Sequence, residues 1–209
     1  MRRTSEISTP RGPARVTYDR PDGDPVSLLV LGHGAGGDVD APDLVAVRDA
    51  AIAAGVAVAR VTQPYRVAGR RAPAPAGQLD EAWAAVLAAL RADVAGPLVV
   101  GGRSSGARVA CRTASAVGAV GIVALAFPLH PPGRPERSRA AELATGLPTL
   151  VVNGDRDPFG LPPGGGPVQV VVRPGERHDL RRDPAGVAAV VVGWLCGHGW
   201  ADRGPCPPA

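Results

Sequence analysis

Two adjacent serines lie in residues 102–106, GRSSG, and their setting could make one of them a nucleophile. The segment fits the pattern G-x-S-x-G, which is typical of a tight strand-to-helix turn that exposes the central serine hydroxyl. Ser104 has glycine at both required positions, whereas Ser105 would be flanked by Arg103 and Ala107. Small flanking residues are needed because the strained turn brings neighbouring backbone too close for a Cβ atom. The spacing therefore predicts Ser104 as the nucleophile.

A glycine-rich turn, HGAGG at residues 33–37, follows the apolar run Val26–Leu31. Backbone N–H groups of such a turn, with the N–H of the residue after the nucleophile, can stabilise the oxyanion that forms when a carbonyl is attacked. We therefore expect an oxyanion hole made by the N–H groups of Ala35 and Ser105. His33 is expected to brace the turn rather than to take part in the chemistry.

A nucleophilic serine also needs a general base, and the base needs an acid that orients it. His178 lies in a loop after the apolar run Val168–Val172, so it is the expected base. Two carboxylates, Asp155 and Asp157, follow the apolar run Thr149–Val152, and both are open as the acid. The chain order serine, acid, histidine, with each residue just after a strand-like run, indicates acyl transfer by a serine nucleophile. This chemistry requires no metal and no organic cofactor.

Valine-rich runs of strand length alternate with longer segments of helical spacing, which predicts an α/β fold with helices on both faces of a mostly parallel sheet. The run Arg15–Tyr18 alternates more and is expected nearer an edge. About seven strands are expected in all, which leaves little room for an inserted cap domain in 209 residues. We expect one domain over residues 1–200 and a flexible tail over 201–209. The six further strands are expected at Val26–Leu31, Val56–Val61, Pro97–Val100, Val120–Ala126, Thr149–Val152 and Val168–Val172, and the helices at Leu44–Ala54, Gln78–Ala92, Ala107–Ala116 and Gly186–Leu195.

Two proline-rich stretches, residues 62–77 and 127–136, follow strand-like runs and are expected to be neither helix nor central strand. Ligands bind at the carboxyl ends of the strands in open α/β sheets, so we expect these stretches to wall a shallow site. Arginines there would favour an acidic or phosphorylated acyl substrate, although surface arginines in a chain without lysine account for them equally well. The substrate-pocket candidates are His33, Tyr65, Arg70, Arg71 and His130.

The composition limits the partners. The 23 basic residues exceed the 19 acidic ones by 4, but they are scattered rather than gathered in a stripe, so no nucleic-acid partner is expected. Three widely spaced cysteines fit neither a disulfide framework nor a zinc site. No run approaches the roughly 18 apolar residues of a membrane span, and the N-terminus has no apolar core. We expect a cytoplasmic protein without a membrane partner, and its oligomeric state stays open.

Several segments together resemble one family. The chain looks like a small, lidless α/β-hydrolase of the dienelactone-hydrolase-like group, which includes the testis-expressed protein 30 type and the hydrolase-like subunit of a histone acetyltransferase complex. The matching segments are HGAGG (33–37), QPYRVAGRRAPAP (63–75), GGRSSGARVA (101–110), FPLHPPGRPE (127–136), PTLVVNGDRDPFG (148–160) and GERHDL (175–180).

The resemblance implies an α/β-hydrolase fold without a cap domain, and it places the acid of its G-x-x-D pattern on Asp157, with Asp155 as a charged neighbour. Members of the group often have an aromatic residue before the Pro-Tyr pair and a methionine after the nucleophile. This chain has Gln63 and Ser105 at those positions. Both differences would make the pocket more polar, so the substrate preference of relatives is not carried over.

The function that these expectations favour is a serine hydrolase that cleaves a small ester, thioester or lactone through an acyl-enzyme intermediate. Its partner would be a small-molecule acyl substrate, and an acyl acceptor other than water stays open. The alternative is a catalytically silent protein of the same fold that acts as an interaction module. A nucleotide-phosphate loop at GGRSSG is disfavoured, because its glycine spacing is wrong and a chain without lysine lacks the P-loop lysine.

Overall fold

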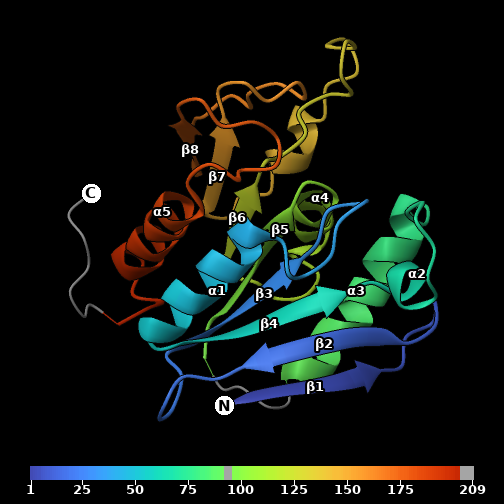
Figure 1. Ribbon diagram of the computed structural model, residues 1–209, viewed down its shortest axis with the longest axis vertical. Coiled ribbons are helices and arrows are strands. Elements are labelled where there is room, and N and C mark those ends of the chain that lie inside the picture. The colour runs from blue at the N-terminus through green and yellow to red at the C-terminus, as the bar shows by residue number, and fades with distance from the viewer. Residues whose placement is uncertain (92–95, 203–209) are drawn as a thin grey trace.

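A computed structural model describes residues 1–91 and 96–202. The fold is built on an eight-stranded sheet of order β1-β2-β4-β3-β5-β6-β7-β8 (Figure 1). All neighbours from β4 to β8 pair in parallel, whereas β1 and β2 run antiparallel to their neighbours. The strands span Arg2–Ile7 (β1), Ala14–Asp19 (β2), Ser27–Gly32 (β3), Val56–Thr62 (β4), Leu98–Arg103 (β5), Gly121–Leu125 (β6), Thr149–Gly154 (β7) and Val168–Arg173 (β8).

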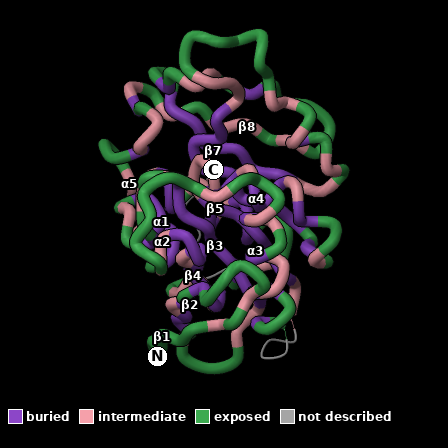
Figure 2. Tube along the Cα trace, turned by 90° about the vertical axis from the view of Figure 1, so that its right-hand side faces the viewer, coloured by how far each residue is buried: buried purple, intermediate pink, exposed green. Residues whose placement is uncertain are grey.

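Helices cover both faces of the sheet, as the alternation of segments predicts. On one face α1 (Pro42–Ala53) and α5 (Pro184–Gly197) close a core with the β3, β4, β6 and β7 side chains that point to them. On the other face α3 (Ala76–Arg91) and α4 (Ser105–Thr113) close a second core around Trp83. Figure 2 shows the central strands buried between these layers, whereas β1 is exposed. Strands buried on both faces need near-continuous apolar sequence, which explains their valine content.

The sheet of about seven expected strands is extended by one, because the polar segment RRTSEI forms β1 and pairs with β2 along the whole edge. One expectation about elements needs correction. The proline-rich stretch 62–77 contains a short helix, α2 (Pro64–Val67). Proline is compatible with the first turn of a helix, where its missing N–H would have no intrahelical acceptor. The other short helix is the 3₁₀ segment η1 (Ala140–Leu143).

The described part of the chain ends on the α1–α5 face. Ala201 is buried and the N–H of Asp202 donates to the carbonyl of Ala54, so these two residues of the expected tail pack against the domain. The rest of that expected tail, residues 203–209, and Ala92 of an expected helix lie outside the described residues. None of the helices in residues 1–91 and 96–202 is both long and apolar enough to cross a bilayer.

Parallel pairing brings the carboxyl ends of β3, β5, β7 and β8 to the same edge of the sheet. The glycine-rich turn after β3, the serine turn after β5, the two aspartates after β7 and the histidine loop after β8 are therefore neighbours in space, although up to about 140 residues of chain separate them. The described part of the chain holds no inserted cap over this edge.

Candidate active site

Ser104 occupies a strained turn between β5 and α4. Its φ is +53° and its ψ is −110°, a backbone conformation that residues other than glycine rarely adopt. The N–H of Ser104 donates to the carbonyl of Leu125 at 2.9 Å, which holds the turn against β6. A Cβ atom on Gly102 or Gly106 would collide with the backbone of Gly32. The close approach of β3 thus explains why glycine is needed on both sides of the serine.

His178 links the serine to an aspartate. Its Nε2 lies 2.9 Å from Ser104 Oγ and its Nδ1 lies 2.8 Å from Asp157 Oδ2. The carboxylate can only accept, so Nδ1 carries the proton and Nε2 accepts from the serine hydroxyl. The Asp157 side chain is fully buried, and its other oxygen accepts the N–H of Phe159 at 2.8 Å. The Phe159 ring packs on the imidazole with 4.1 Å between ring centroids. Together these contacts fix the orientation of the imidazole.

The two aspartates after β7 have different partners. Asp157 contacts His178, whereas the exposed Asp155 accepts the N–H of Gly175 at 2.7 Å and so ties the β7 turn to the turn before the histidine. Of the two aspartates, Asp157 is therefore the one in contact with the imidazole.

Asn153, the buried residue before these aspartates, joins the exits of β6 and β7. Its Oδ1 accepts the N–H of Phe127 at 2.8 Å, and its Nδ2 donates to the carbonyls of Phe127 and Gly160 at 3.1 and 3.3 Å and toward Asp157 Oδ2 at 3.4 Å. Sequence reasoning missed this residue, since its only signal is a polar side chain at the end of an apolar run. Asn153 holds the acid's turn against the neighbouring strand.

The loop after Phe127 is closed at its base by Arg139. The Arg139 N–H donates to Leu129 O at 2.7 Å and its guanidinium donates to Pro128 O at 3.0 Å. Residues 130–138 therefore form a loop whose two ends are pinned together, while its middle is exposed.

His33 braces the glycine-rich turn, as expected. It is buried, its Nε2 accepts the N–H of Gln63 at 3.1 Å, and its Nδ1 donates to Gly34 O at 2.7 Å. Burial lowers the pKa of His33, which keeps the ring neutral. The Tyr65 hydroxyl donates to Ala35 O at 2.8 Å, and burial raises the Tyr65 pKa. Both side chains hold the turn, and both also line a small cavity of about 10 Å³ that Ser105 adjoins.

The expected oxyanion donors lie on two different elements. Ser105 is the first residue of α4, so its N–H has no intrahelical acceptor. Ala35 lies in a turn closed by the Gly37 N–H on Gly34 O at 3.1 Å, and Tyr65 fixes the carbonyl of the same residue. An oxygen placed at the start of α4 would also benefit from the positive end of the helix dipole.

A hollow of about 500 Å³ adjoins the imidazole. We call it the His178 hollow; it is lined by Arg103, Arg156, Pro158, Arg177, His178 and Asp179. Three cations thus face one carboxylate. Sequence reasoning missed this set, because Arg156 and Arg177 cannot be told from other surface arginines without knowing which loops meet.

The structure does not bring the other expected pocket residues to the His178 hollow. Arg70 lines a separate hollow of about 70 Å³ beside α2 and α3, and Arg71 is exposed. Figure 1 shows α2 beside α3, away from β7 and β8. His130 packs against Gly160, and its Nδ1 donates to Pro131 O at 2.9 Å. The proline-rich stretch after β4 turns toward the β2 side of the sheet, which is why its arginines lie elsewhere.

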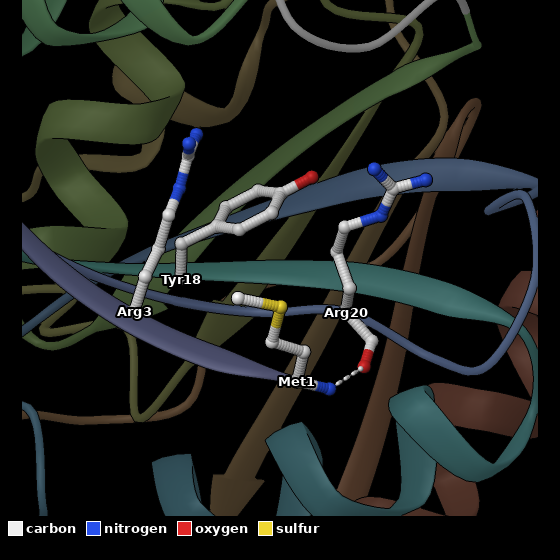
Figure 3. Close-up of a pocket in the computed structure, with 4 residues that line it drawn as sticks. All are labelled: Met1, Arg3, Tyr18 and Arg20. Atoms are coloured by element: carbon white, nitrogen blue, oxygen red, sulfur yellow. Dashed lines mark hydrogen bonds between the residues drawn. The ribbon is translucent and has the colours of Figure 1, made fainter.

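A second arginine-lined hollow, of about 320 Å³, lies at the β1 edge (Figure 3). We call it the edge hollow; Met1, Arg3, Tyr18 and Arg20 line it. The Arg3 guanidinium lies over the Tyr18 ring at 5.0 Å, and the Met1 amino group donates to Arg20 O at 3.0 Å. None of the residues expected to carry chemistry lines it.

The cysteines offer no competing nucleophile among the described residues. Cys111 and Cys196 are buried. Burial raises the pKa of the Cys111 thiol to about 12, and a thiol must ionise to attack. The third, Cys206, lies outside the described residues.

Comparison with known proteins identifies the architecture. Residues 25–163 match the sequence model of a family described as the alpha/beta hydrolase domain. No curated protein shows significant sequence similarity to the chain. A lidless α/β serine hydrolase from Xanthomonas campestris superimposes with a TM-score of 0.76 at 19% identity, over 100% of this chain and 96% of that one. An α/β serine hydrolase homologue from Coxiella burnetii gives 0.74 at 20% identity, over 91% and 95%.

A dienelactone hydrolase from Anabaena variabilis gives a TM-score of 0.74 at 17% identity, over 94% of this chain and 97% of that one. At these identities the likeness concerns the fold. It confirms the expectation of an α/β-hydrolase fold with a mostly parallel sheet and no cap domain.

Proposed function

The chain belongs to the alpha/beta hydrolase domain family, and from that premise we propose that it is a serine hydrolase that cleaves a small ester, thioester or lactone through an acyl-enzyme. The observation that supports this most is the unbroken path from Ser104 Oγ through His178 to a fully buried Asp157, with bonds of 2.9 and 2.8 Å. A strained serine at a helix start adds support, because a scaffold has no need of such a conformation.

In the proposed first half-reaction, Ser104 Oγ attacks the carbonyl carbon and its proton passes to His178 Nε2. Asp157 stabilises the imidazolium through Nδ1–H, while the N–H groups of Ala35 and Ser105 hold the oxyanion. The tetrahedral intermediate collapses, the bond to the alcohol, thiol or lactone oxygen breaks, and His178 returns the proton to that leaving group. The product of this half-reaction is an acyl ester on Ser104.

In the second half-reaction, His178 takes a proton from water, and the resulting nucleophile attacks the acyl carbon. Collapse of the second tetrahedral intermediate returns the proton to Ser104 Oγ and releases a carboxylic acid. The proposed reaction needs no metal and no organic cofactor.

The test is labelling by a fluorophosphonate probe together with a panel of acyl esters, thioesters and lactones. Wild-type protein is expected to be labelled on Ser104 and to turn over at least one substrate class. Ser104→Ala is expected to lose labelling and at least about 10³-fold in rate. Ser115→Ala, which changes an exposed serine beyond α4, is the matched control. A wild type that is neither labelled nor active would favour the interaction module instead.

The His178 hollow supports a preference for acyl groups that carry a negative charge. Among the described residues, neither Arg156 nor Arg177 has an ion-pair partner, and the lone lining carboxylate, Asp179, already lies 3.7 Å from Arg181. An unneutralised cationic wall attracts anions and weakens with salt. This proposal moves the anion-binding role from Arg70 and Arg71 to the arginines of the hollow.

Assignment to the testis-expressed protein 30 type, to the acetyltransferase-complex type or to the dienelactone hydrolases stays a prediction, as does a cytoplasmic location.

A further inference from the structure

Arg103, the residue immediately before the serine, has an unusual setting for an arginine. Its side chain is 15% exposed, although it lies at the open end of the sheet. Its Nε lies 3.3 Å from Asp43 Oδ2, and its Nη2 donates to the backbone carbonyl of His178 at 3.0 Å. Its Nη1 lies beside the glycine-rich turn, 3.5 Å from the point where a Cβ on Gly34 would be. One guanidinium therefore contacts three segments of the candidate site.

Asp43 explains why the guanidinium stays there. This residue of the first turn of α1 is fully buried, and no side chain in the described part of the chain makes a hydrogen bond to its carboxylate. Arg103 is its one cationic neighbour within ion-pair distance among those residues. Burial raises the pKa of Asp43 to about 6, with the nearby charge of Asp179 adding to the rise and Arg103 opposing it. Loss of Arg103 would leave a buried carboxylate uncompensated, which is strongly destabilising.

His178 is thereby held at both ends. Asp157 fixes the ring through Nδ1, and Arg103 fixes the backbone through the carbonyl oxygen. Upstream, the buried Glu176 anchors the loop by accepting the N–H groups of Arg182 and Asp183. Arg103 is thus the contact between the serine turn and the backbone of the histidine itself.

We propose that the Asp43–Arg103 pair positions His178 and the Gly34–Gly37 turn relative to Ser104, so that proton transfer and oxyanion binding act on the same carbonyl. Arg103 is a positioning residue, since it acts on the reacting atoms through His178. The expected effect of Arg103 on catalysis rests on the proposed function. A displacement of about 1 Å in such a constellation costs up to about 10²-fold in rate.

A single Arg103→Met substitution would leave the buried Asp43 carboxylate without a counter-charge, and unfolding would then mask any effect on the candidate site. The informative variant is the double substitution Asp43→Asn/Arg103→Met, which removes both charges and keeps the side-chain volumes close. The matched control is Asp80→Asn/Arg112→Met, because this pair also joins an arginine to a carboxylate, here a half-buried one, with bonds of 2.9 and 2.6 Å between α4 and α3.

Thermal unfolding, fluorophosphonate labelling and steady-state kinetics are compared across wild type and the two double variants. The Asp43/Arg103 variant is expected to unfold cooperatively, to label at least about tenfold more slowly, and to lose kcat by about 10- to 100-fold with KM within about threefold. The control is expected to keep wild-type kcat. A folded Asp43/Arg103 variant with wild-type labelling rate and kcat would overturn the positioning role.

The NMR signals of the His178 ring, assigned with His178→Ala, separate this inference from the proposed function. The Nδ1 proton that bonds to Asp157 is expected to shift or vanish in the Asp43/Arg103 variant and to stay in the control. If wild type is neither labelled nor active, the proposed function fails and these signals decide the positioning role alone. Unchanged His178 signals in the folded variant would then refute it, and altered signals beside an unchanged control would support it.

Discussion

The His178 hollow and the edge hollow are both lined by arginine, yet they are built differently. The residues of the His178 hollow come from the ends of parallel strands and the loops after them, while those of the edge hollow come from the start of the chain and from β2 and its end (Figures 1 and 3). His178, which lines the first, bonds to the strained Ser104 and to the buried Asp157. Positive charge alone therefore does not make a candidate active site, and convergence of strand ends adds the reactive groups.

The largest expected difference in kcat is between variants of the two aspartates after β7. Asp157→Asn keeps the shape of the side chain but favours the wrong imidazole tautomer, so kcat is expected to fall by about 10³- to 10⁴-fold. Asp155→Asn changes the neighbouring carboxylate, which contacts Gly175 instead of the imidazole, and is expected to cost less than about tenfold. Steady-state hydrolysis of the best substrate measures both. Equal losses in the two variants would contradict the assignment of the acid.

The buried Asp43, which contacts Arg103 of the His178 hollow, predicts a pH-dependent stability. Its pKa is about 6 in the folded protein, above its ordinary value of 3.8, so between these values the folded state binds the proton more tightly than the unfolded chain. The contribution of Asp43 to the free energy of unfolding therefore falls as the pH rises from about 4 to about 6, by about 3 kcal/mol. Asp43→Asn should remove this fall.

Urea unfolding of wild type and Asp43→Asn at pH 4 and pH 7 measures the change. The matched control is Asp24→Asn, which replaces an exposed carboxylate beside Arg20 of the edge hollow. The stability difference between Asp43→Asn and wild type should grow with pH, and a difference that is the same at both pH values would contradict the prediction.

Two buried tyrosines, Tyr65 beside the glycine-rich turn and Tyr18 in the edge hollow, offer a matched pair. Tyr65→Phe removes the hydroxyl that fixes the Ala35 carbonyl, so kcat is expected to fall by about tenfold as the proposed oxyanion donor loosens. Tyr18→Phe, in the edge hollow, should leave kcat unchanged. A loss of similar size in both variants would point to a general effect on the fold.

The smallest expected effect concerns Arg156 and Arg177 of the His178 hollow. Arg156→Ala/Arg177→Ala is expected to lower the ratio of kcat/KM for a succinate monoester over a neutral ester of equal length by about fivefold at low salt, because exposed ion pairs are weak. The loss should shrink at high ionic strength.

Two double variants serve as controls for that ratio. Arg3→Ala/Arg20→Ala in the edge hollow and Arg70→Ala/Arg71→Ala beside α2 should both leave it unchanged. If the Arg70/Arg71 variant alone lowers the ratio, the anion site lies where the sequence first indicated.

Sequence patterns were sufficient to predict the structure at positions where the fold accepts only one type of residue. Gly102 and Gly106 lie where β3 leaves no room for a Cβ, and the apolar runs lie in strands buried on both faces. These features predicted the serine turn, the order of the strands along the chain and the meeting of the loops. The geometry agrees with the expected partners of His178, while their catalytic roles stay predictions.

The features that sequence missed depend on contacts between distant segments. β1 has no apolar run, and it forms because β2 offers an unpaired edge. Asp43 reads as an ordinary acidic residue in the first turn of a helix, and only the fold shows it buried against Arg103. The proposed role of Arg156 and Arg177 depends on two loops that meet at one hollow.

The pinned base of the loop at residues 130–138 has a practical consequence for enzyme engineering. Asn153 bonds Phe127 to the turn that carries Asp157, and Arg139 holds the two loop ends together. A change in the exposed middle of the loop should therefore not move Asp157. Sequence grafted into the middle of this loop would start from two ends that are already held together, so it should leave the turn of Asp157 undisturbed. New binding residues could therefore be introduced in this loop while the rest of the domain is left unchanged.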